Sequence, residues 1–408
     1  MRRGHLSDFF SGVVVKTLSA VETRPAVSNQ HEFNGSSPLR ALLGEDDRRN
    51  IPSRFVWLGA DYESRGADGW LSWYDARRAH PSRTEYRLYY PENDVTGLMK
   101  PDDLFFLAML RDGSALVVVT PSGTTMENQL LWLFGLDAPA GYQFAFQDVA
   151  KESSAELDLA AKFILDELGI EVPESEADLL DILLEPFGSK FPSTRIFSRL
   201  ARESLPDVSA LDDPDRAIVE WMEREEQLFR RLERRIVSVR LADGFHSGES
   251  DPVDAFLGFS LSVQNRRKAR AGSALENHLE ELFSQHGLMF ARGAETENRN
   301  KPDFLFPGQA QYRDPDYPSA GLTMLGAKST LKDRWRQVLS EALRIDDKHL
   351  LTLEPGVSEN QTDEMRTKRL QLVVPLSIQK TYKPAQQAWL LGVADFVRIV
   401  RSREGSRL

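Results

Sequence analysis

The chain has 408 residues, a formal net charge of −11 at pH 7 and no cysteine. This length usually divides into two or three domains. The lack of cysteine excludes disulfides and thiolate metal sites, and it fits a cytoplasmic protein. No apolar run approaches the roughly 20 residues of a membrane helix, and the interrupted apolar stretch 6–15 does not predict a secretory signal. The negative net charge argues against a protein surface that is positively charged throughout and binds DNA everywhere, but it allows local basic surfaces.

Residues 1–150 are predicted to be rich in β-strands. Short runs of β-branched and aromatic residues alternate there with turn-forming residues such as Asp61, Gly66 and Asp75. The runs fall at residues 54–59, 71–74, 85–90, 104–110 and 114–120. This pattern predicts a small barrel with one or two peripheral helices.

Residues 151–240 are predicted to form a helical linker region. Residues 155–165 have helical apolar spacing, and Gly169 stands where that helix would stop. Residues 213–239 predict a long charged helix. Such a helix could connect two domains or pack on the flank of one, and the pattern leaves both open.

Residues 241–408 become mixed α/β from about residue 261, which favours a central sheet flanked by helices. One helix is expected at residues 272–286, ended by Gly287. Further helices are expected at 334–343 and 386–400. Strands are expected at 288–290, 303–306, 322–325, 350–353 and 370–374.

Three short segments carry the most informative chemistry: Lys301-Pro-Asp-Phe304, Gly326-Ala-Lys328 and Lys332-Asp-Arg-Trp-Arg336. Asp303, at the entrance of a predicted strand, could hold a hard cation through oxygen. Lys328, at the end of another, could offset the charge of a phosphate or orient a nucleophilic water. Arg334 and Arg336 could bind phosphates or guanines. Together these residues indicate a metal-dependent phosphodiesterase.

Each of these residues also has an ordinary structural explanation. Asp303 could be a turn residue and Lys328 a charge that ends a strand. Competing chemistry is absent from the sequence, since it holds no Gly-x-Ser-x-Gly motif, phosphate loop or dinucleotide fingerprint. The seven histidines show no metal-ligand spacing.

The order of several longer segments adds a resemblance to a known family. Residues 262–272, 275–283, 286–288, 301–307, 332–337 and 354–358 resemble the catalytic domain of EcoRII-type restriction endonucleases. Residues 16–20, 74–77 and 82–87 resemble the N-terminal part of the same enzymes more thinly.

The resemblance implies a catalytic domain of the PD-(D/E)XK class joined to an N-terminal pseudobarrel. In this family the pseudobarrel binds a second copy of the recognition site on double-stranded DNA and also blocks the catalytic cleft. Such enzymes are homodimers, need Mg²⁺, and reach full cleavage only with effector DNA.

Four residues match catalytic positions of the family. Asp303 matches the metal-binding aspartate and Lys328 the catalytic lysine. Glu276 matches a glutamate on the preceding helix, and Glu341 the acid supplied by a later helix. The last match is relevant because Gly326 stands where the usual motif has an acid. A helix starting near residue 332 would bring Glu341 toward the same Mg²⁺, which needs two or more oxygen ligands. By pattern alone, Glu276 and Glu341 would more often be surface residues.

The resemblance also assigns DNA contacts in the catalytic domain. Asp333 and Arg334 match a pair that reads C·G base pairs, because aspartate accepts from cytosine and arginine binds guanine in bidentate fashion. Arg336 could add a base or phosphate contact. A basic run could bind the DNA backbone, although it could equally be a solvated helix start. This run comprises Arg266, Arg267, Lys268 and Arg270.

In the N-terminal region, six residues fall at or near effector-DNA positions of the family: Lys16, His31, Arg77, Arg83, Glu85 and Arg87. Two departures stand out. Ser82 replaces a lysine of the family, and Trp70 replaces an arginine. Trp70 could be a stacking surface or an ordinary core residue, so the effector site could read a different or modified sequence.

The sequence therefore predicts a Mg²⁺-dependent, two-site restriction endonuclease that recognises a CC-GG site with a central A·T pair. Two alternatives stay open. One is a modification-dependent nuclease, and the other is a DNA-binding regulator that keeps the nuclease scaffold without cutting.

Overall fold

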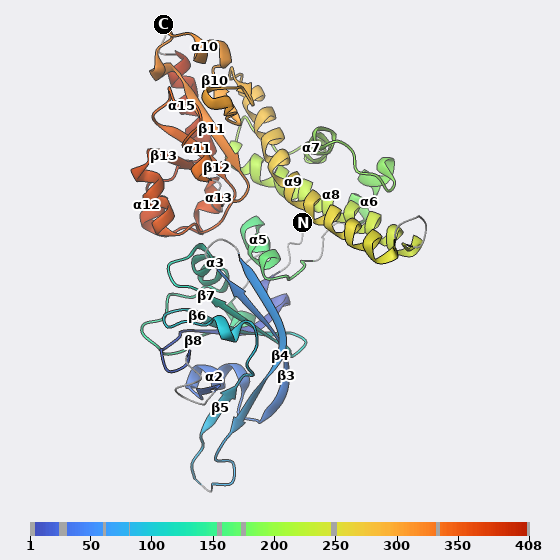
Figure 1. The fold of residues 1–408 in the computed structure, drawn as a ribbon, viewed down its shortest axis with the longest axis vertical. Coiled ribbons are helices and arrows are strands. Elements are labelled where there is room, and N and C mark those ends of the chain that lie inside the picture. The colour runs from blue at the N-terminus through green and yellow to red at the C-terminus, as the bar shows by residue number, and fades with distance from the viewer. Residues whose placement is uncertain are drawn as a thin grey trace. The chain divides into compact units, whose positions relative to one another are not determined.

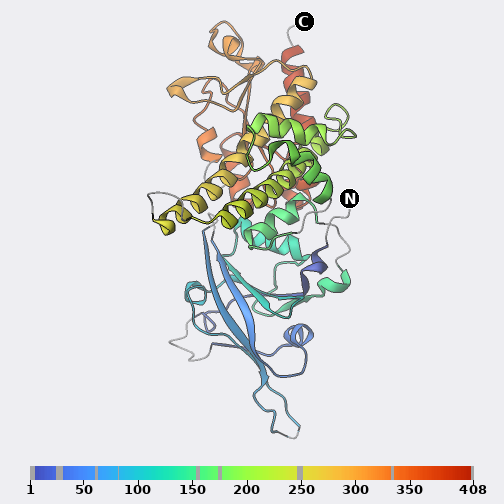
Figure 2. The same cartoon turned by 90° about the vertical axis from the view of Figure 1, so that its right-hand side faces the viewer.

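The structure is a computed structural model that describes residues 5–23, 31–59, 63–80, 82–152, 157–172, 177–245, 251–331 and 335–405. The chain divides into two compact units. The N-terminal unit comprises residues 2–173 with 355–360, and the C-terminal unit comprises residues 174–354 with 361–408. Each unit contains one sheet (Figure 1; Figure 2). Among the described residues, no helix has the length and apolar character needed to cross a membrane.

The N-terminal unit is built on a curled eight-stranded sheet in the order β2-β5-β4-β3-β7-β6-β1-β8. Neighbouring strands are antiparallel except for β3 and β7. All five strands expected in this region are confirmed. The strands are β1 (Phe10–Thr17), β2 (Glu32–Asn34), β3 (Arg48–Leu58), β4 (Ser64–Asp75), β5 (Tyr86–Tyr89), β6 (Leu104–Leu110), β7 (Ala115–Thr120) and β8 (Ala145–Gln147).

The curled sheet buries apolar side chains on both of its faces. Along β1, Val13 and Val15 point into one core and Val14 into the other, because successive side chains of a strand alternate between faces. The first core is covered by α3 and α5, and the second is filled by aromatic residues such as Phe33 and Trp73. The helices of this unit are α2 (Ser37–Leu43), α3 (Thr125–Phe134), α4 (Val149–Glu152) and α5 (Leu159–Glu167).

The C-terminal unit has a five-stranded sheet in the order β13-β12-β11-β10-β9. β9, β10 and β11 pair antiparallel, whereas β11, β12 and β13 pair parallel. The mixed α/β class expected here is confirmed, and so are four of the five expected strands. The strands are β9 (Ala291–Arg292), β10 (Phe304–Phe306), β11 (Thr323–Lys328), β12 (Lys348–Thr352) and β13 (Leu370–Val373). The division of the sequence at residues 150 and 240 stays a prediction.

The fifth expected strand, residues 288–290, is wrong. Gly287 ends helix α9 with φ +67°, and the apolar residues after it pack as a loop. The Phe290 ring lies 6.0 Å from that of Phe283 and 5.8 Å from that of Phe304. The apolar run therefore marks core packing, and strand pairing starts only at Ala291.

Two long helices, α8 (Pro214–Asp243) and α9 (Pro252–Gln285), form an antiparallel hairpin (Figure 1). Leu228, Phe229 and Leu232 of α8 pack against residues of two shorter helices. The remaining helices of this unit are α6 (Ala177–Leu184), α7 (Thr194–Glu203), α10 (Gln309–Arg313), α11 (Trp335–Val338), α12 (Glu359–Thr367), α13 (Leu376–Gln379), α14 (Pro384–Gln387) and α15 (Val393–Gly405).

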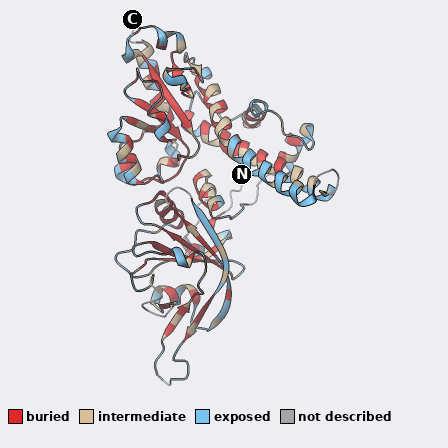
Figure 3. Cartoon of the chain, viewed as in Figure 1, coloured by how far each residue is buried: buried red, intermediate tan, exposed pale blue. Residues whose placement is uncertain are grey.

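Helix α9 begins twenty residues before the predicted start at residue 272. Its start signals are Asp251, whose carboxylate accepts from the Val253 backbone N–H at 2.8 Å, and Pro252 at the first helical position. The first half of α9 is largely exposed (Figure 3). The apolar residues of this half do not face the core of the same chain. The spacing of apolar residues therefore did not predict that the helix extends over residues 252–271.

The helix expected at residues 386–400 is two helices, α14 and α15. The intervening residues leave the helical path because Leu391 forms a β-bridge with Val373. The second helix is anchored by Asp215 at the start of α8, whose buried carboxylate accepts from Val393 N at 2.8 Å and Ala394 N at 2.9 Å. The same carboxylate accepts from Leu376 N at 3.1 Å.

Candidate active site

Asp303 and Lys328 meet at the end of the pair formed by β10 and β11. Phe304 pairs with Leu325 in this antiparallel ladder, which brings the residue before β10 next to the last residues of β11. Asp303 Oδ2 accepts from Lys328 Nζ at 2.8 Å and from the Ala327 backbone N–H at 2.7 Å. Both side chains are partly buried. The structure therefore brings together the first two residues that the sequence assigned to catalysis.

Gly326 has no room for the acid that the usual motif carries at this position. A Cβ atom there would lie 2.9 Å from Val338 Cγ2 and 3.3 Å from Leu350 Cδ1. Val338 belongs to α11, which packs over this face of β11. A carboxylate at position 326 would point into apolar packing, so the second acid has to come from another segment.

Glu341, the residue predicted to be this second acid, lies in a loop. The helix expected at residues 334–343 is wrong in its extent, because α11 covers only Trp335–Val338 and Ala342 has a left-handed φ of +47°. Burial, together with the negative charge of Asp303, raises the pKa of Glu341 to about 7, while Lys328 and Lys348 oppose the shift. Glu341 Oε2 is buried and has no hydrogen-bond partner within the described part of the chain.

A hard cation fits this pair of carboxylates. An oxygen that is buried without a partner is costly, and a cation shared with Asp303 would satisfy it. Across the described ranges, no cluster of three or more His, Asp or Glu side chains is arranged to hold a metal. Two carboxylates suit Mg²⁺, which keeps several waters and binds substrate phosphates as well. Asp303 and Glu341 are the residues that would hold it.

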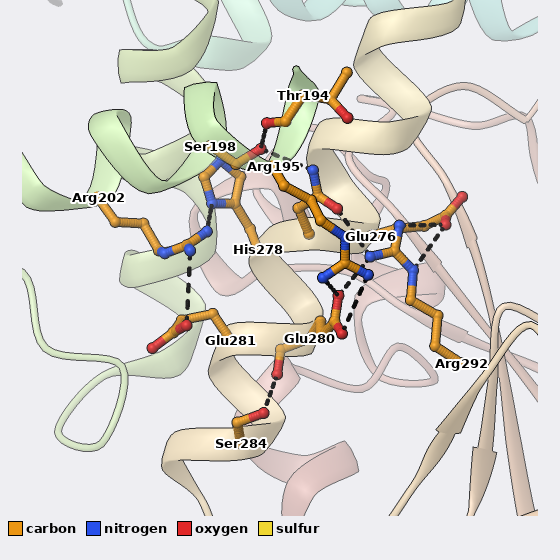
Figure 4. A network of polar contacts seen from close by, with 11 residues as sticks. Thr194, Arg195, Ser198, Arg202, Glu276, His278, Glu280, Glu281, Ser284 and Arg292 are labelled. Carbon is orange, nitrogen blue, oxygen red and sulfur yellow. Dashed lines mark hydrogen bonds and ion pairs between the residues drawn. The ribbon is translucent and has the colours of Figure 1, made fainter. Parts of the chain in front are cut away.

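Glu276, the fourth predicted catalytic residue, is engaged elsewhere. Its carboxylate accepts from Arg292 Nη2 at 2.8 Å and Nε at 3.2 Å. Arg292 also donates to Asn277 Oδ1 at 2.8 Å and to Glu280 at 2.5 Å (Figure 4). Since Arg292 pairs with Phe304 across β9 and β10, Glu276 lies on the side of β10 where the sheet meets α9. No hydrogen bond joins it to Asp303, Lys328 or Glu341 among the described residues.

The Arg292 contacts extend into a network between α7 and α9 (Figure 4). Arg195 of α7 pairs with Glu280 at 3.1 Å, and Arg202 pairs with Glu281 at 3.6 Å. Arg202 also lies 3.2 Å from Nδ1 of the buried His278. Burial lowers the pKa of His278, although Glu225, 2.9 Å away, opposes this shift. The network fixes the helix that carries Glu276.

The predicted base-reading residues Asp333 and Arg334 lie outside the described residues. Arg336, the third of this set, is on α11. Its guanidinium pairs with Glu364 at 2.8 Å and lies 4.8 Å from the Trp335 ring centroid. Its side chain is exposed, so a DNA contact is compatible with this position.

The basic run predicted to bind the DNA backbone is part of α9. Arg270 is only 7% exposed, pairs with Glu226 and lies 4.1 Å from the Phe229 ring centroid. Burial lowers its pKa to about 10. Arg267 pairs with Glu233 at 2.5 Å. The structure thus gives Arg267 and Arg270 partners within the helical hairpin, which corrects the expectation of a free basic arm.

Arg266 lies 4.4 Å from the Phe191 ring centroid. Of Lys268, only the backbone is described, so its side chain lies outside the described part of the run. Arg266 is exposed, so a contact with the DNA backbone is compatible with its position.

The predicted effector-DNA residues separate into buried and exposed ones. Lys16 is only 4% exposed, pairs with Glu22 and lies over the Phe33 ring. A contact of Lys16 with DNA would require this pair to open. His31 packs edge to face on Tyr90, with 5.6 Å between the ring centroids.

Glu85 lies between two of the predicted DNA-contacting arginines. It pairs with Arg77 at 2.5 Å and also with Arg87. These pairs, led by the hydrogen bond from Arg87, lower the pKa of Glu85. Arg83 is exposed close by in the sequence, and so is Ser82, one of the two departures from the family.

Trp70, the other departure, is not a core residue. It is 38% exposed and stacks on Tyr89 with 5.3 Å between ring centroids and an interplanar angle of 27°. Trp70 and Arg87 both lie on the outer face of the sheet, opposite the buried Leu71 and Leu88. An aromatic stacking surface therefore takes the place of the expected arginine.

Sequence reasoning missed the residues that support Glu341. They are Thr296, Glu297, Asn300 and Lys348, which hydrogen-bond to the segment around Glu341. The available signal for Lys348 was a lysine just before a predicted strand, followed by His349 and two leucines. Glu354 was recognised only as part of a matching segment, yet it is fully buried, accepts from Leu331 N, and has a pKa raised by burial to about 8.

A partly parallel sheet with an Asp–Lys pair at a strand end and a second acid in a nearby loop is the arrangement that the sequence led us to expect of a metal-dependent nuclease. The comparisons with known proteins agree. Residues 229–397 match the family described as EcoRII C terminal. The C-terminal part of the chain is therefore similar to that family.

The relative found among curated proteins is the "Type II restriction enzyme EcoRII" of Escherichia coli. It is 40% identical over 230 residues, which cover 56% of this chain and 55% of that protein. The chain thus matches about half the length of this relative.

Two solved structures are similar to part of the chain. One is metal-depleted Ecl18kI in complex with uncleaved, modified DNA. It has 19% identity and a TM-score of 0.42, and the match covers 57% of this chain and 86% of that chain. The other is a complex of the restriction endonuclease PspGI with substrate DNA. It has 13% identity and a TM-score of 0.43, and the match covers 53% of this chain and 95% of that chain.

Proposed function

We propose that this chain is a Mg²⁺-dependent type II endonuclease that hydrolyses double-stranded DNA at specific sites. The observation that carries this proposal is the 2.8 Å contact of Lys328 with Asp303 next to a buried Glu341 whose Oε2 lacks a partner. The 40% identity to EcoRII over 230 residues supports it. The cytoplasmic location expected from the composition is part of the same proposal.

Each residue of the site has a role that follows from its chemistry. Asp303 and Glu341 would hold the metal through oxygen. A bound Mg²⁺ supplies charge neutralisation for the phosphoryl group. Lys328, oriented by Asp303, places its ammonium where it stabilises negative charge on the phosphate or orients the attacking water. Glu276 acts indirectly, since its carboxylate is held by Arg292.

The reaction would be an in-line hydrolysis. The water oxygen forms a bond to phosphorus, and the bond from phosphorus to the 3′ oxygen breaks. The attacking water gives up one proton to solvent and the 3′ oxygen takes one up, which leaves a 3′-hydroxyl and a 5′-phosphate. Because Lys328 is partly buried, its charge is screened less by water than an exposed lysine would be.

The recognition site is proposed from the residues around α11. Asp333 would accept from cytosine N4, and Arg334 would bind guanine in bidentate fashion. Arg336, exposed on the adjoining helix, would add a further contact. The target that the resemblance implies is CC-GG with a central A·T pair.

The N-terminal unit is proposed to bind a second copy of the site and to restrain cleavage until it does so. Supporting residues are the exposed Arg83 and the exposed or partly exposed Arg77, Arg87 and His31, with Glu85 between the two arginines. Effector DNA would have to bind the active form more tightly than the restrained form, because only differential affinity shifts such a balance.

We further propose a homodimer that forms through the first half of α9. Val253, Phe256, Leu257 and Leu261 are exposed there at helical spacing. Exposed apolar stripes of this kind mark association surfaces. Replacing Phe256 and Leu261 together by glutamate should give a monomer in analytical ultracentrifugation. The matched control is glutamate at the exposed Met289, which should leave a dimer.

The test of the function is a digest of a mixed-sequence DNA library with Mg²⁺, followed by sequencing of the ends. Cleavage at one defined sequence is the expected result, and Asp303→Ala should lose it. No cleavage by the folded protein, together with tight DNA binding, would instead identify a non-cleaving DNA-binding regulator.

A modification-dependent nuclease is the second candidate, and the exposed Trp70–Tyr89 stack favours it. An aromatic surface contacts methyl groups or bases where an arginine would contact phosphate. The library should therefore be digested in methylated and unmethylated form. Cleavage of the methylated library alone would establish this second function.

A further inference from the structure

Glu341 occupies a loop, and yet a metal ligand has to be held precisely. Side chains on helices and strands are placed more exactly than those on loops. The residue after Glu341, Ala342, has a φ of +47°, which residues with a side chain rarely adopt. Such a conformation persists only where the surrounding structure enforces it. The contacts that enforce it come from two sides.

Side chains from the loop before β10 hold one side of this segment. Asn300 Nδ2 donates to the Ser340 carbonyl at 2.8 Å. The backbone N–H groups that follow Glu341 donate to the Thr296 hydroxyl at 3.4 Å, from Ala342, and to the Glu297 carboxylate at 3.2 Å, from Leu343. Three side chains within five residues thus fix the backbone on both sides of Glu341.

Glu297 is itself held in place. The buried Tyr312 hydroxyl lies 2.7 and 2.6 Å from its two carboxylate oxygens. The Arg344 backbone N–H reaches the same hydroxyl at 3.2 Å. The Tyr312 hydroxyl thus fixes the Glu297 carboxylate, and this carboxylate accepts from the backbone N–H of Leu343 in the loop.

Lys348 holds the other side. It is the first residue of β12 and is only 7% exposed. Its ammonium donates to the carbonyl of Ile345 at 2.8 Å and to that of Ala342 at 3.3 Å. A buried ammonium is costly unless it is fully hydrogen-bonded. Here its bonds are made to the segment that carries Glu341.

We propose that Glu297 and Lys348 are positioning residues that hold the loop of Glu341, the first through a backbone N–H and the second through two backbone carbonyls, and so set its place as a metal ligand. Neither residue belongs to the proposed set of metal ligands, Asp303 and Glu341. The inference rests on the proposed function and goes beyond it, because it predicts that metal affinity depends on two residues outside the ligand set.

The experiment uses Lys348→Met and Glu297→Gln in the full chain. Lys348→Met keeps the length of the side chain and removes the donor, and Glu297→Gln keeps the shape and removes the charge. Mn²⁺ binding is titrated through the electron paramagnetic resonance signal of free Mn²⁺, and the Mg²⁺ concentration for half-maximal cleavage is measured separately. Lys368→Met, at an exposed lysine of the same unit, is the matched control.

Both variants should weaken Mn²⁺ binding and raise the half-maximal Mg²⁺ concentration by roughly 10- to 100-fold, the usual effect of residues that orient metal ligands. Cleavage at saturating metal and DNA binding without metal should stay close to wild type, and Lys368→Met should change neither. If Lys348→Met does not fold, Glu297→Gln decides the outcome.

A lower cleavage rate with an unchanged half-maximal metal concentration would overturn the positioning role. If Asp303→Ala binds Mn²⁺ as tightly as the wild-type protein does, the proposed metal site itself is overturned. The two failures are therefore distinguishable.

Discussion

Gly326 and Val338 are packed so closely that a Cβ atom on the glycine would lie 2.9 Å from Cγ2 of the valine. Gly326→Ala should therefore destabilise the C-terminal unit by about 1–3 kcal/mol, the usual cost of overpacking a core. Adding Val338→Ala should recover part of this loss. Urea unfolding measures both effects, and Gly272→Ala, which meets no atom within 4 Å and lies outside the proposed dimer interface, is the control. Equal stability of Gly326→Ala and wild type would contradict this account of the missing acid.

Removing any one of Asp303, Lys328 or Glu341 should abolish most cleavage. Each alanine variant should lose at least roughly 100-fold in rate, as expected for loss of a group that stabilises transition-state charge. Specific DNA binding should be largely kept. Single-turnover cleavage and a gel-shift titration measure the two properties, and Asp363→Ala, at an exposed carboxylate, is the control. Robust Mg²⁺-dependent cleavage by the Asp303 or Lys328 variant would rule out the assignment.

Arg334→Ala should reduce specificity more than affinity. Loss of one bidentate guanine contact costs roughly 1–3 kcal/mol of discrimination. The variant should lose this amount on the recognition site and much less on unrelated DNA, in competition binding at fixed salt. An equal loss on both DNAs would make Arg334 a phosphate contact.

The buried Glu354 should make stability fall as the pH rises. Its pKa is raised from 4.5 to about 8 by burial, and the hydrogen bond from Leu331 opposes this shift only in part. Between these two pH values the unfolded chain releases the proton while the folded chain keeps it. The contribution of Glu354 to the free energy of unfolding is therefore full below about pH 4.5. It declines toward pH 8 by at most about 1.4 kcal/mol per pH unit.

Glu354→Gln removes this titration. The free energy of unfolding of wild type minus that of the variant should decrease steadily from pH 5 to pH 8, as followed by urea unfolding at each pH. Other titrating groups cancel in the difference. Parallel curves for the two proteins would mean that Glu354 is already ionised in the folded chain.

A protein shortened to residues 174–408 should cut DNA with a single site faster than the full chain. The sequence placed the start of the catalytic region at residue 241, but this position lies inside α8, whose Leu228 and Phe229 belong to the core of the C-terminal unit. The start near residue 174 keeps α8 intact. In the full chain, Arg83→Ala should slow cleavage, since it weakens effector binding.

Single-site cleavage rates of the two proteins at equal concentration decide the matter, with circular dichroism to verify that the fragment folds. A folded fragment that is no faster than the full chain would make the N-terminal unit a simple targeting module.

The Asp303–Lys328 pair could be predicted because both residues flank strands with clear apolar runs. The sequence also located most strands in both units. Glu341 was found by resemblance, yet its loop was not, because Ala342 has a conformation that no local pattern announces.

The supporting residues could not be predicted for a related reason. Glu297 acts through the backbone N–H of Leu343, which lies 46 residues away in the sequence. Lys348 binds carbonyls only three and six residues before it, in a loop whose conformation no local pattern predicts. Likewise, Arg270 looked free in sequence because its acidic partner Glu226 lies on the other helix of the hairpin. Local patterns show which charges exist, and only the tertiary structure shows which of them are already paired.

The carboxylate of Asp215 has a consequence for how the protein is made. It joins α8 to the start of α15 through hydrogen bonds that span 178 and 179 residues. A chain emerging from the ribosome reaches Asp215 long before the groups that this carboxylate holds. Contacts so distant in sequence close late, so the core of the C-terminal unit is completed only after residues 393–394 have been made. We therefore expect incomplete nascent chains to be susceptible to proteolysis around α8 until residues 393–394 have emerged.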